Sequence, residues 1–380
     1  MIPFNKPYLS TNEEQYVLDA LKSGRICGNN QYAQKVFGHL EQKHGLENSF
    51  LVPSGTSALE MGAILADLGP GDEVILPSYT FSSTANAVVL TGAKPVFCEI
   101  DPGTMNADVG HAASLVSERT KMLLPIDYAG IPCDLDGFLS LAEIHNLSLM
   151  VDAAQSYGSY YKGQACGSMG DLAAFSFHET KNISCGEGGA LIVNNPEWIE
   201  RAHFLQEKGT DRRLVLYGQK TKYHWVDKGS SYLLSDILAA LLLSQLESED
   251  IIHGLRRKVA DAYFELYKPY RDWDLISFTP YDKFEQVNNH AFWVIFDTEQ
   301  KKEDFIMSLK AMNIHAYIGY LPLHSSPMGI KLGNDINDLP ITQDVASRIV
   351  RLPMYASLAN EGLDYCLEKM QNVMKQIYGE

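Results

Sequence analysis

The stretch ALEMGAILADLGPGDEVILPSYTFSSTANAVVLTGAKPVFCEI, residues 58–100, decides the fold class of this 380-residue chain. Two segments, 58–68 and 82–92, carry apolar residues at helical spacing and end at glycines. Two others, 73–77 and 94–100, are short, continuously apolar runs, which is typical of strands buried on both faces. Helices that alternate with such strands indicate a parallel sheet covered on both sides, so we predict an α/β fold.

The same alternation continues to residue 195. Further helices are expected at 106–117 and 134–146, and further strands at 121–126, 147–154, 172–177 and 190–195. Sheets of this kind bind their ligands beyond the carboxyl ends of the strands. Candidate functional residues are therefore sought where these strands end.

A long helical stretch, 232–268, separates this region from the C-terminal part of the chain. In that part, 290–297 is expected to be a strand and 302–313 a helix. We predict an N-terminal arm and a large, mostly parallel domain over residues 1–250, followed by a smaller α+β domain over residues 251–380.

The composition excludes several classes of protein. A net charge of −16 argues against a nucleic-acid partner, which would require a basic surface. The six cysteines lack the spacings of zinc sites, so we expect reduced thiols and no metal. The sequence has neither an apolar run of about 18 residues nor a signal-peptide core in MIPFNKPYLS, so we expect a cytoplasmic protein without a membrane partner.

Polar and aromatic residues follow two of the expected strands. Asp152 and Gln155 stand at the end of the strand 147–154. A buried carboxylate is costly unless it is paired, and a helix cap or an ion pair explains Asp152 as well as a ligand does. Phe81 follows the strand 73–77 and is either a core residue or a platform for a ring.

PSGTSALE, residues 53–60, places Gly55, Thr56 and Ser57 at the start of a helix. Free backbone N–H groups and two hydroxyls in this position can cradle a phosphate. Ordinary capping of the helix by serine or threonine is the alternative. The stretch is neither a Walker loop nor a dinucleotide-binding glycine motif.

SFHETKNIS, residues 176–184, holds a single lysine, Lys181, between two apolar strands. It is either an ordinary loop lysine or a reactive amine. A lysine amine, a strand-end carboxylate, an aromatic side chain and a phosphate cradle together are what pyridoxal phosphate requires. In that case burial or a nearby cation should lower the pKa of Lys181, because an attacking amine must be neutral.

These motifs, in this order, resemble the DegT/DnrJ/EryC1/StrS family of sugar aminotransferases over nearly the whole chain. The similarity is carried by MIPFNKP, by the stretch from GTSALEM to AKPVF, and by VDAAQ, HETKN, GSSYLLSD, YLPLH and RLPMYASL. It implies fold type I of the pyridoxal-phosphate enzymes, the aspartate-aminotransferase fold. It also implies a homodimer with shared active sites.

The resemblance further implies a role for each matching residue. Lys181 would be the Schiff-base lysine and proton shuttle, and Asp152 would pair with the pyridinium nitrogen. The other cofactor contacts would be Gln155 at the ring or its 3-oxygen, Phe81 on the ring face, Gly55, Thr56, Ser57 and Ser176 at the phosphate, and Ser231 at the phosphate of the neighbouring subunit. Dehydrases of the family have histidine in place of the lysine, but here Lys181 is intact, and His178 is expected to be a packed or loop histidine.

The implied reaction moves the amino group of L-glutamate to C4 of dTDP-4-keto-6-deoxyglucose, giving 2-oxoglutarate and dTDP-4-amino-4,6-dideoxygalactose. Candidate contacts for the sugar or the diphosphate are Tyr320, His324, Arg212, Arg213 and Arg25. Relatives often have His-Tyr where this chain has Gly319-Tyr320. A C3 or gluco-configured C4 aminotransferase and a non-catalytic regulatory protein that binds pyridoxal phosphate remain alternatives.

Overall fold

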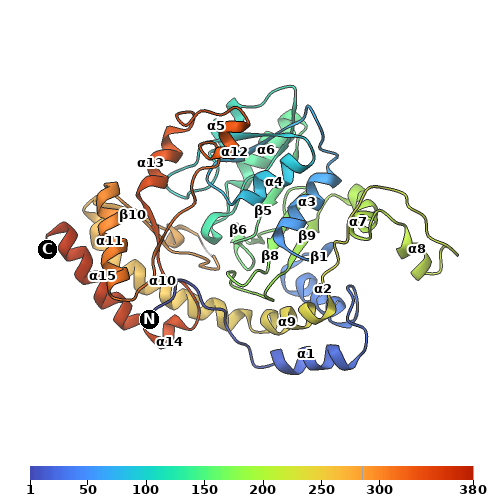
Figure 1. The fold of residues 1–380 in the computed structure, drawn as a ribbon, viewed down its shortest axis with the longest axis horizontal. Helices are drawn as coiled ribbons and strands as arrows, with labels where there is room; N and C mark the ends of the chain where they lie inside the picture. Colours follow the sequence, from blue (N-terminus) through green and yellow to red (C-terminus); the bar gives the residue numbers. More distant parts are fainter. Residues whose placement is uncertain (285, 380) are drawn as a thin grey trace.

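The computed structural model describes residues 1–284 and 286–379, and within them seven strands form the main sheet (Figure 1). Their order across the sheet is β1 (Ser49–Val52), β9 (Gly189–Val193), β8 (Leu172–Ser176), β5 (Ser148–Asp152), β4 (Thr120–Leu123), β2 (Glu73–Pro77) and β3 (Lys94–Cys98). The strands from β8 to β3 pair in parallel, whereas β9 is antiparallel to both of its neighbours. The predicted large, mostly parallel sheet is confirmed.

Both faces of this sheet are buried, as continuously apolar strands require. Along β2, Val74 and Leu76 belong to one hydrophobic cluster and Ile75 to another, because side chains alternate between the two faces. One face packs against α3 (Gly55–Leu65), α4 (Ser82–Leu90) and α7 (Ile199–Gln206). The other face packs against α2 (Gln31–His44), α6 (Leu135–His145) and α9 (Asp236–Glu247).

The smaller C-terminal domain is built on an antiparallel sheet, four strands wide in the part of the chain that the structure describes. Its strand order is β10 (Ile276–Phe278), β11 (Trp293–Phe296), β13 (Ile349–Arg351) and β12 (Tyr317–Ile318). Helices α11 (Glu299–Ala311) and α15 (Leu363–Tyr378) pack together beside it at the left of Figure 1. The expected strand and helix of this domain are confirmed; the strand is shorter than predicted, and the helix begins three residues earlier and ends two residues earlier.

The expected long helix, 232–268, is two helices. α9 ends at Glu247 and α10 (Glu249–Asp272) begins two residues later, after Ser248. Ser248 has φ −102° and ψ 5°, which interrupts the helix. Glu249 and Asp250 then open α10, where the helix dipole favours negative charge. Together the two helices run beneath both domains in Figure 1.

The N-terminal arm begins on the small domain. The N–H of Ile2 donates to the carbonyl of Asn313 at 2.8 Å, and the N–H of His315 donates to the carbonyl of Ile2 at 3.0 Å. Ile2 is buried in the hydrophobic core of that domain, and the arm then leads to α1 (Glu13–Lys22) under the large domain. A domain boundary near residue 250 stays a prediction, but the first residues of the arm pack with the smaller domain.

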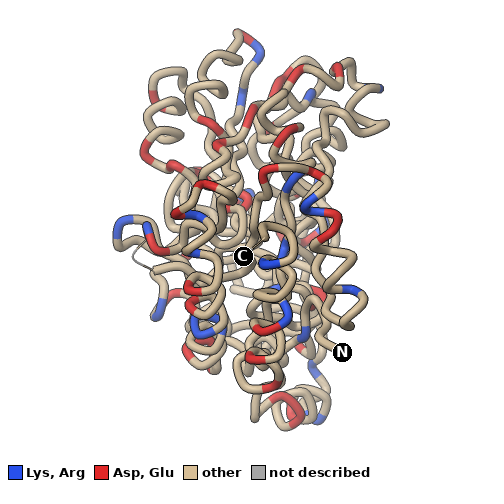
Figure 2. The backbone as a smooth tube through the Cα atoms, turned by 90° about the vertical axis from the view of Figure 1, so that its left-hand side faces the viewer, with Lys and Arg blue, Asp and Glu red and all other residues tan. Residues whose placement is uncertain are grey.

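The remaining elements are short connections. They are α5 (Val109–Ser114), the hairpin β6 (Tyr160–Tyr161) and β7 (Gln164–Ala165), α8 (Arg212–Leu216), α12 (Pro327–Lys331), α13 (Pro340–Arg348) and α14 (Leu358–Glu361), with 3-10 turns at Tyr128–Gly130, Pro196–Trp198 and Tyr281–Lys283. A search of the described residues finds no helix with the length and apolarity that a bilayer crossing needs. On the face shown in Figure 2, acidic and basic positions are interspersed along the chain.

Candidate active site

A cavity of about 380 Å³ lies at the carboxyl ends of the parallel strands, where the large domain meets the small one. This is the position at which parallel sheets bind ligands. The predicted residues that line it are Gly55, Thr56, Phe81, Asp152, Gln155, Ser176, Lys181 and Tyr320. Folding therefore brings together residues that are spread over 265 positions of the sequence, from 55 to 320.

The N-terminus of α3 forms one wall of this cavity. Ser54 caps the helix, because its Oγ accepts from the N–H of Ser57 at 3.0 Å. Capping thus falls to Ser54, and the N–H groups of Gly55 and Thr56 have no acceptor within the helix. A Cβ on Gly55 would lie 2.7 Å from the Cβ of Ser176, so only glycine lets α3 approach the end of β8 this closely.

The hydroxyls of Thr56 and Ser57, both at the start of α3, differ in whether they can contact a ligand in the cavity. Thr56 Oγ1 lies 2.7 Å from Ser83 Oγ, and both residues line the cavity. Ser57 Oγ lies 3.0 Å from Ser54 Oγ, and Ser57 is absent from the described residues that line the cavity. The predicted phosphate contacts of Gly55, Thr56 and Ser176 are therefore adjacent, while the side chain of Ser57 is engaged in the cap.

Asp152 ends β5 and is 8% exposed. Its carboxylate accepts from Thr84 Oγ1 at 2.7 Å and from the N–H of Ala154 at 3.2 Å, and within the described chain it has no ion-pair partner. Burial raises the pKa of Asp152, although these two hydrogen bonds and the charge of Lys181 oppose the shift. An ion pair does not explain this buried carboxylate, which can take a further donor from a ligand.

Lys181 lies in a turn after β8, where its N–H donates to the carbonyl of His178 at 2.9 Å. Its Nζ has neither a hydrogen-bond nor an ion-pair partner among residues 1–284 and 286–379, and it faces the cavity. Burial lowers the pKa of Lys181 to about 8; the charge of Arg351 adds to this effect and that of Asp152 opposes it. This is the direction of shift that a reactive amine requires.

Aromatic side chains form the wall opposite the sheet. Phe81 is 58% exposed, so it is not the core residue that its sequence context allows, and its ring lies 6.2 Å from that of Tyr320. Gln155 is held at both ends of its amide: Oε1 accepts from the N–H of Ala129 at 2.7 Å, and Nε2 donates to Tyr320 Oη at 3.2 Å. The exposed side chain of Phe81 therefore lines the cavity, and the amide of Gln155, which also lines it, is fixed by hydrogen bonds at both ends.

The structure removes His324 from the candidate substrate contacts. Its side chain is completely buried, with Nδ1 2.6 Å from Ser78 Oγ, so it ties the segment before α12 to the end of β2. Packing also explains why glycine stands at position 319, because a Cβ there would lie 1.8 Å from Tyr79 Oη. As this wall is packed, the histidine that relatives often have does not fit.

Three other predicted residues lie away from the cavity of their own chain. Arg212, on α8, is exposed and 3.7 Å from Glu207. Ser231 is exposed, and its backbone pairs with Glu207 in an isolated antiparallel β-bridge. The guanidinium of Arg213 lies over the ring of Tyr217. Their predicted roles toward the substrate or a neighbouring subunit stay predictions.

His178, expected in a loop, lines the cavity, and its Nδ1 lies 2.9 Å from Thr180 Oγ1.

Comparison with known proteins identifies the family. The model of the DegT/DnrJ/EryC1/StrS aminotransferase family matches residues 7–371. This chain belongs to that family.

Similarity to individual proteins supports this membership. The chain is 29% identical over 373 residues to a GDP-perosamine synthase of Escherichia coli O157:H7, covering 97% of both chains. It is 31% identical over 388 residues to the spore coat polysaccharide biosynthesis protein SpsC of Bacillus subtilis, covering 98% of this chain and 97% of that one. A putative sugar aminotransferase of Streptococcus pneumoniae, Spr1654 in its PMP form, superposes with a TM-score of 0.91 at 26% identity, covering 99% and 100% of the two chains.

The DegT/DnrJ/EryC1/StrS aminotransferase therefore has the predicted fold type I and depends on pyridoxal phosphate. The residues present fit this cofactor. Gly55 beside Ser176 leaves room for a phosphate at a helix N-terminus, and the Asp152 carboxylate can accept a further hydrogen bond. Within the described residues the amine of Lys181 has no partner. The enzyme is a sugar aminotransferase.

Arg351 and His290 are among the cavity residues that the sequence analysis did not assign. Arg351, on β13, lies with its guanidinium 5.2 Å from the rings of both Phe4 and Tyr320. His290 Nδ1 donates to Asn182 Oδ1 at 3.0 Å, and burial lowers the pKa of His290 well below the usual range. Arg351 ends β13 and His290 precedes β11 by three residues, so their approach to Lys181 depends on how the two domains pack.

Proposed function

We propose that this aminotransferase transfers the amino group of L-glutamate to C4 of dTDP-4-keto-6-deoxyglucose, giving dTDP-4-amino-4,6-dideoxygalactose. One observation carries the transfer itself: a lysine amine and a buried carboxylate line the same cavity, and in the part of the chain that the structure describes neither has an ion-pair partner. The choice of sugar is supported by the motifs MIPFNKP, HETKN and GSSYLLSD. The unpartnered amine also argues against a regulatory protein that merely binds the cofactor.

Each residue of the cavity has a separate role in the proposed reaction. Bound pyridoxal phosphate supplies an electron-accepting ring that allows the carbon bearing the amino group to give up a proton. Lys181 Nζ would take this proton from the donor and pass it on within the same half-reaction, and it would deliver a proton to C4 of the sugar in the second half, as a group with a pKa near 8 can do at neutral pH. Asp152 holds a proton on the ring nitrogen, and Phe81 covers one face of the ring.

The phosphate is held by the N–H groups of Gly55 and Thr56 and by the hydroxyls of Thr56 and Ser176. These donors cost no reorganisation when the ligand arrives, because the cap at Ser54 already fixes the start of α3. Tyr320, held by Gln155, stands where the sugar would lie against the aromatic wall. Its ring and hydroxyl together suit an amphipathic hexose.

We also infer a cytoplasmic homodimer with shared active sites. Large apolar side chains are exposed between α8 and Ser231, namely Leu216, Tyr217, Tyr223, Trp225 and Val226. A soluble monomer rarely exposes such a group together, which supports a partner surface. Ser231 and Arg212 belong to the same exposed segment and would reach the cofactor and diphosphate of the neighbouring chain. Light scattering should give twice the mass of one chain; a monomer that is fully active would contradict shared sites.

The substrate is tested by incubating the enzyme with glutamate and dTDP-4-keto-6-deoxyglucose and determining the configuration at C4 of the product by NMR. An axial amine at C4 is expected. An equatorial amine would establish the gluco-configured alternative, and an amine at C3 of the corresponding 3-keto sugar would establish the other. A GDP-linked 4-keto-6-deoxyhexose is the competing substrate to include, since one relative is named a GDP-perosamine synthase.

A further inference from the structure

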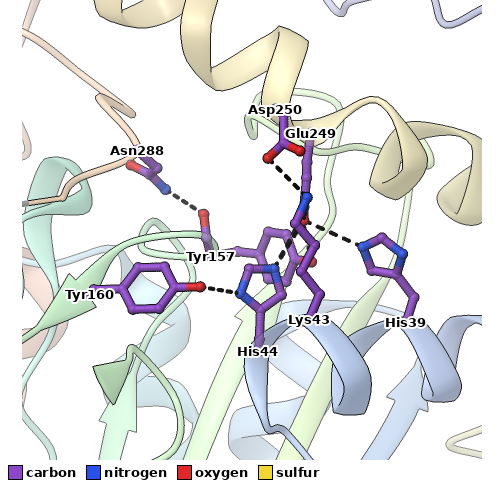
Figure 3. Close-up of polar contacts among 8 residues, drawn as sticks. All are labelled: His39, Lys43, His44, Tyr157, Tyr160, Glu249, Asp250 and Asn288. Carbon is purple, nitrogen blue, oxygen red and sulfur yellow. Dashed lines mark hydrogen bonds and ion pairs between the residues drawn. The ribbon is translucent and has the colours of Figure 1, made fainter. Parts of the chain in front are cut away.

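Three potential metal ligands converge where α2 meets the start of α10 (Figure 3). His39 and His44 come from the last turns of α2, and Glu249 is the first residue of α10. Glu249 Oε1 lies 3.4 Å from His39 Nε2 and 3.1 Å from His44 Nε2, and the three ligand atoms all lie within 4.8 Å of one another. His44 and Glu249 are buried, while the side chain of His39 is 18% exposed.

These separations suit a small divalent cation. Tetrahedral zinc binds imidazole nitrogen and carboxylate oxygen at about 2.0–2.2 Å, which places neighbouring ligand atoms roughly 3.3–3.5 Å apart. The two measured separations from Glu249 Oε1 are close to this range. The exposed edge of His39 gives a path from solvent to the cluster.

Outer contacts already orient the ligands. Tyr157 Oη donates to Glu249 Oε2 at 2.7 Å. Oε1 is the oxygen close to both histidines, while His44 Nε2 also lies 3.2 Å from Oε2. Tyr160 Oη lies 3.0 Å from His44 Nδ1, the ring nitrogen opposite the one that faces Glu249. Metal-binding histidines usually have such a partner on the second nitrogen, and ligating carboxylates are usually hydrogen-bonded in turn.

Lys43 competes for the same oxygen. Its Nζ lies 2.6 Å from Glu249 Oε1 and 2.9 Å from Asp250 Oδ1. Because its side chain is 35% exposed and Asp250 is largely in solvent, the ammonium can stay on Asp250 when it leaves Glu249. The ammonium of Lys43 thus occupies the position beside Glu249 Oε1, and a bound metal would shift it toward Asp250.

We propose that His39, His44 and Glu249 form a zinc site, with the fourth position taken by water. The metal joins α2 of the large domain to α10, the helix that leads into the small domain. It lies outside the cofactor cavity, since none of the three ligands lines that cavity. Its role is to clamp two helices that are far apart in sequence, so it acts on stability and not on the chemical step.

The test uses the holoenzyme, stripped of metal with a chelator and then titrated with zinc chloride by calorimetry. One equivalent of zinc should bind per chain and should raise the melting temperature. His39→Gln and His44→Gln should abolish stoichiometric binding, while His145→Gln, an exposed histidine on α6, should bind as the wild type does. Because His39 is partly exposed, its variant is expected to fold even if Glu249→Gln does not.

Two further variants separate a metal site from a simple network of hydrogen bonds and ion pairs. Lys43→Met removes the competing charge, so it should tighten zinc binding; in a simple network it would only destabilise the protein. Tyr160→Phe should weaken binding roughly 10-fold, the lower end for an outer-shell contact. The proposal is overturned if the wild type binds no zinc, if both histidine variants bind it unchanged, or if Lys43→Met does not strengthen binding.

Discussion

Lys181 and Lys43 each share their surroundings with a buried carboxylate, but only one of them is paired. Lys43 lies 2.6 Å from Glu249, which also receives a hydrogen bond from Tyr157 and lies beside two histidines. Among residues 1–284 and 286–379, Lys181 has no partner for its amine, and Asp152 in the same cavity accepts only from Thr84 and Ala154.

The difference shows how the fold separates a structural lysine from a reactive one. A charge that is matched within the chain gives the fold a fixed contact between two helices. A charge that is left unmatched is costly until a ligand supplies the missing partner. Burial then lowers the pKa of Lys181 to about 8 and raises that of Asp152, which are the shifts that a cofactor site uses.

The largest effect is expected for Lys181→Ala. Turnover should fall by about 10⁴-fold, because the side chain that moves the proton is gone. The visible absorption band of the covalently held cofactor should disappear as well. Lys310→Ala, an exposed lysine on α11, is the matched control and should keep both the band and the rate. Wild-type turnover in Lys181→Ala would show that this lysine resembles Lys43 more than the cavity suggests.

Asp152→Asn should lower turnover by roughly 10²–10³-fold while some cofactor is retained, since one preorganised electrostatic contact is lost. The measurement is kcat together with cofactor content after dialysis. Thr84→Val removes only a hydrogen bond to Asp152 and should have a smaller effect. An unchanged kcat in Asp152→Asn would mean that another group protonates the ring.

Phe81→Leu should weaken cofactor binding by roughly 2- to 12-fold, the value of one contact between aromatic rings. Cofactor affinity is measured by titrating the apoprotein with pyridoxal phosphate. Leu139, also partly exposed but on α6, provides a control when it is replaced by alanine. Equal affinities for Phe81→Leu and the wild type would remove Phe81 from the cofactor site.

The smallest effect concerns pH. A lowered pKa means that the amine of Lys181 loses its proton at lower pH, so the rate of cofactor capture by the apoprotein should rise with pH and level off above about 8. Arg351→Gln removes a positive charge that disfavours the ammonium form, so the midpoint should move upward. The midpoint is followed by absorbance over a pH series. A wild-type midpoint near that of a free lysine would contradict the burial of this amine.

Much of the fold was predictable from local pattern. Alternating helices and apolar strands over 58–195 predict the parallel sheet, because strands buried on both faces carry no polar alternation. The split between α9 and α10 was not predictable in this way, since apolar spacing continues through Ser248. The three-residue strand β13 was missed because it is too short to show a period.

The residues of the site were likewise predictable where they belong to a local motif and not where they depend on long-range packing. Lys181, Asp152, Phe81 and the start of α3 were expected because each follows or precedes a predicted strand or helix in a motif. Arg351 and His290 were not assigned, because small-domain residues reach the cavity only through the packing of the two domains. His324 was assigned wrongly, since sequence cannot tell a buried tie to Ser78 from a side chain that faces the substrate.

The amino-acid sequence by itself determined the α/β class, the order of the cofactor motifs and the single lysine between two strands, since these depend on neighbours along the chain. Only the tertiary structure decided which charges are paired. His39 and His44 are five residues apart and Glu249 lies 205 residues after His44, so their meeting has no local signature. Whether a buried charge meets a partner depends on long-range packing, and that packing distinguishes the reactive Lys181 from the paired Lys43.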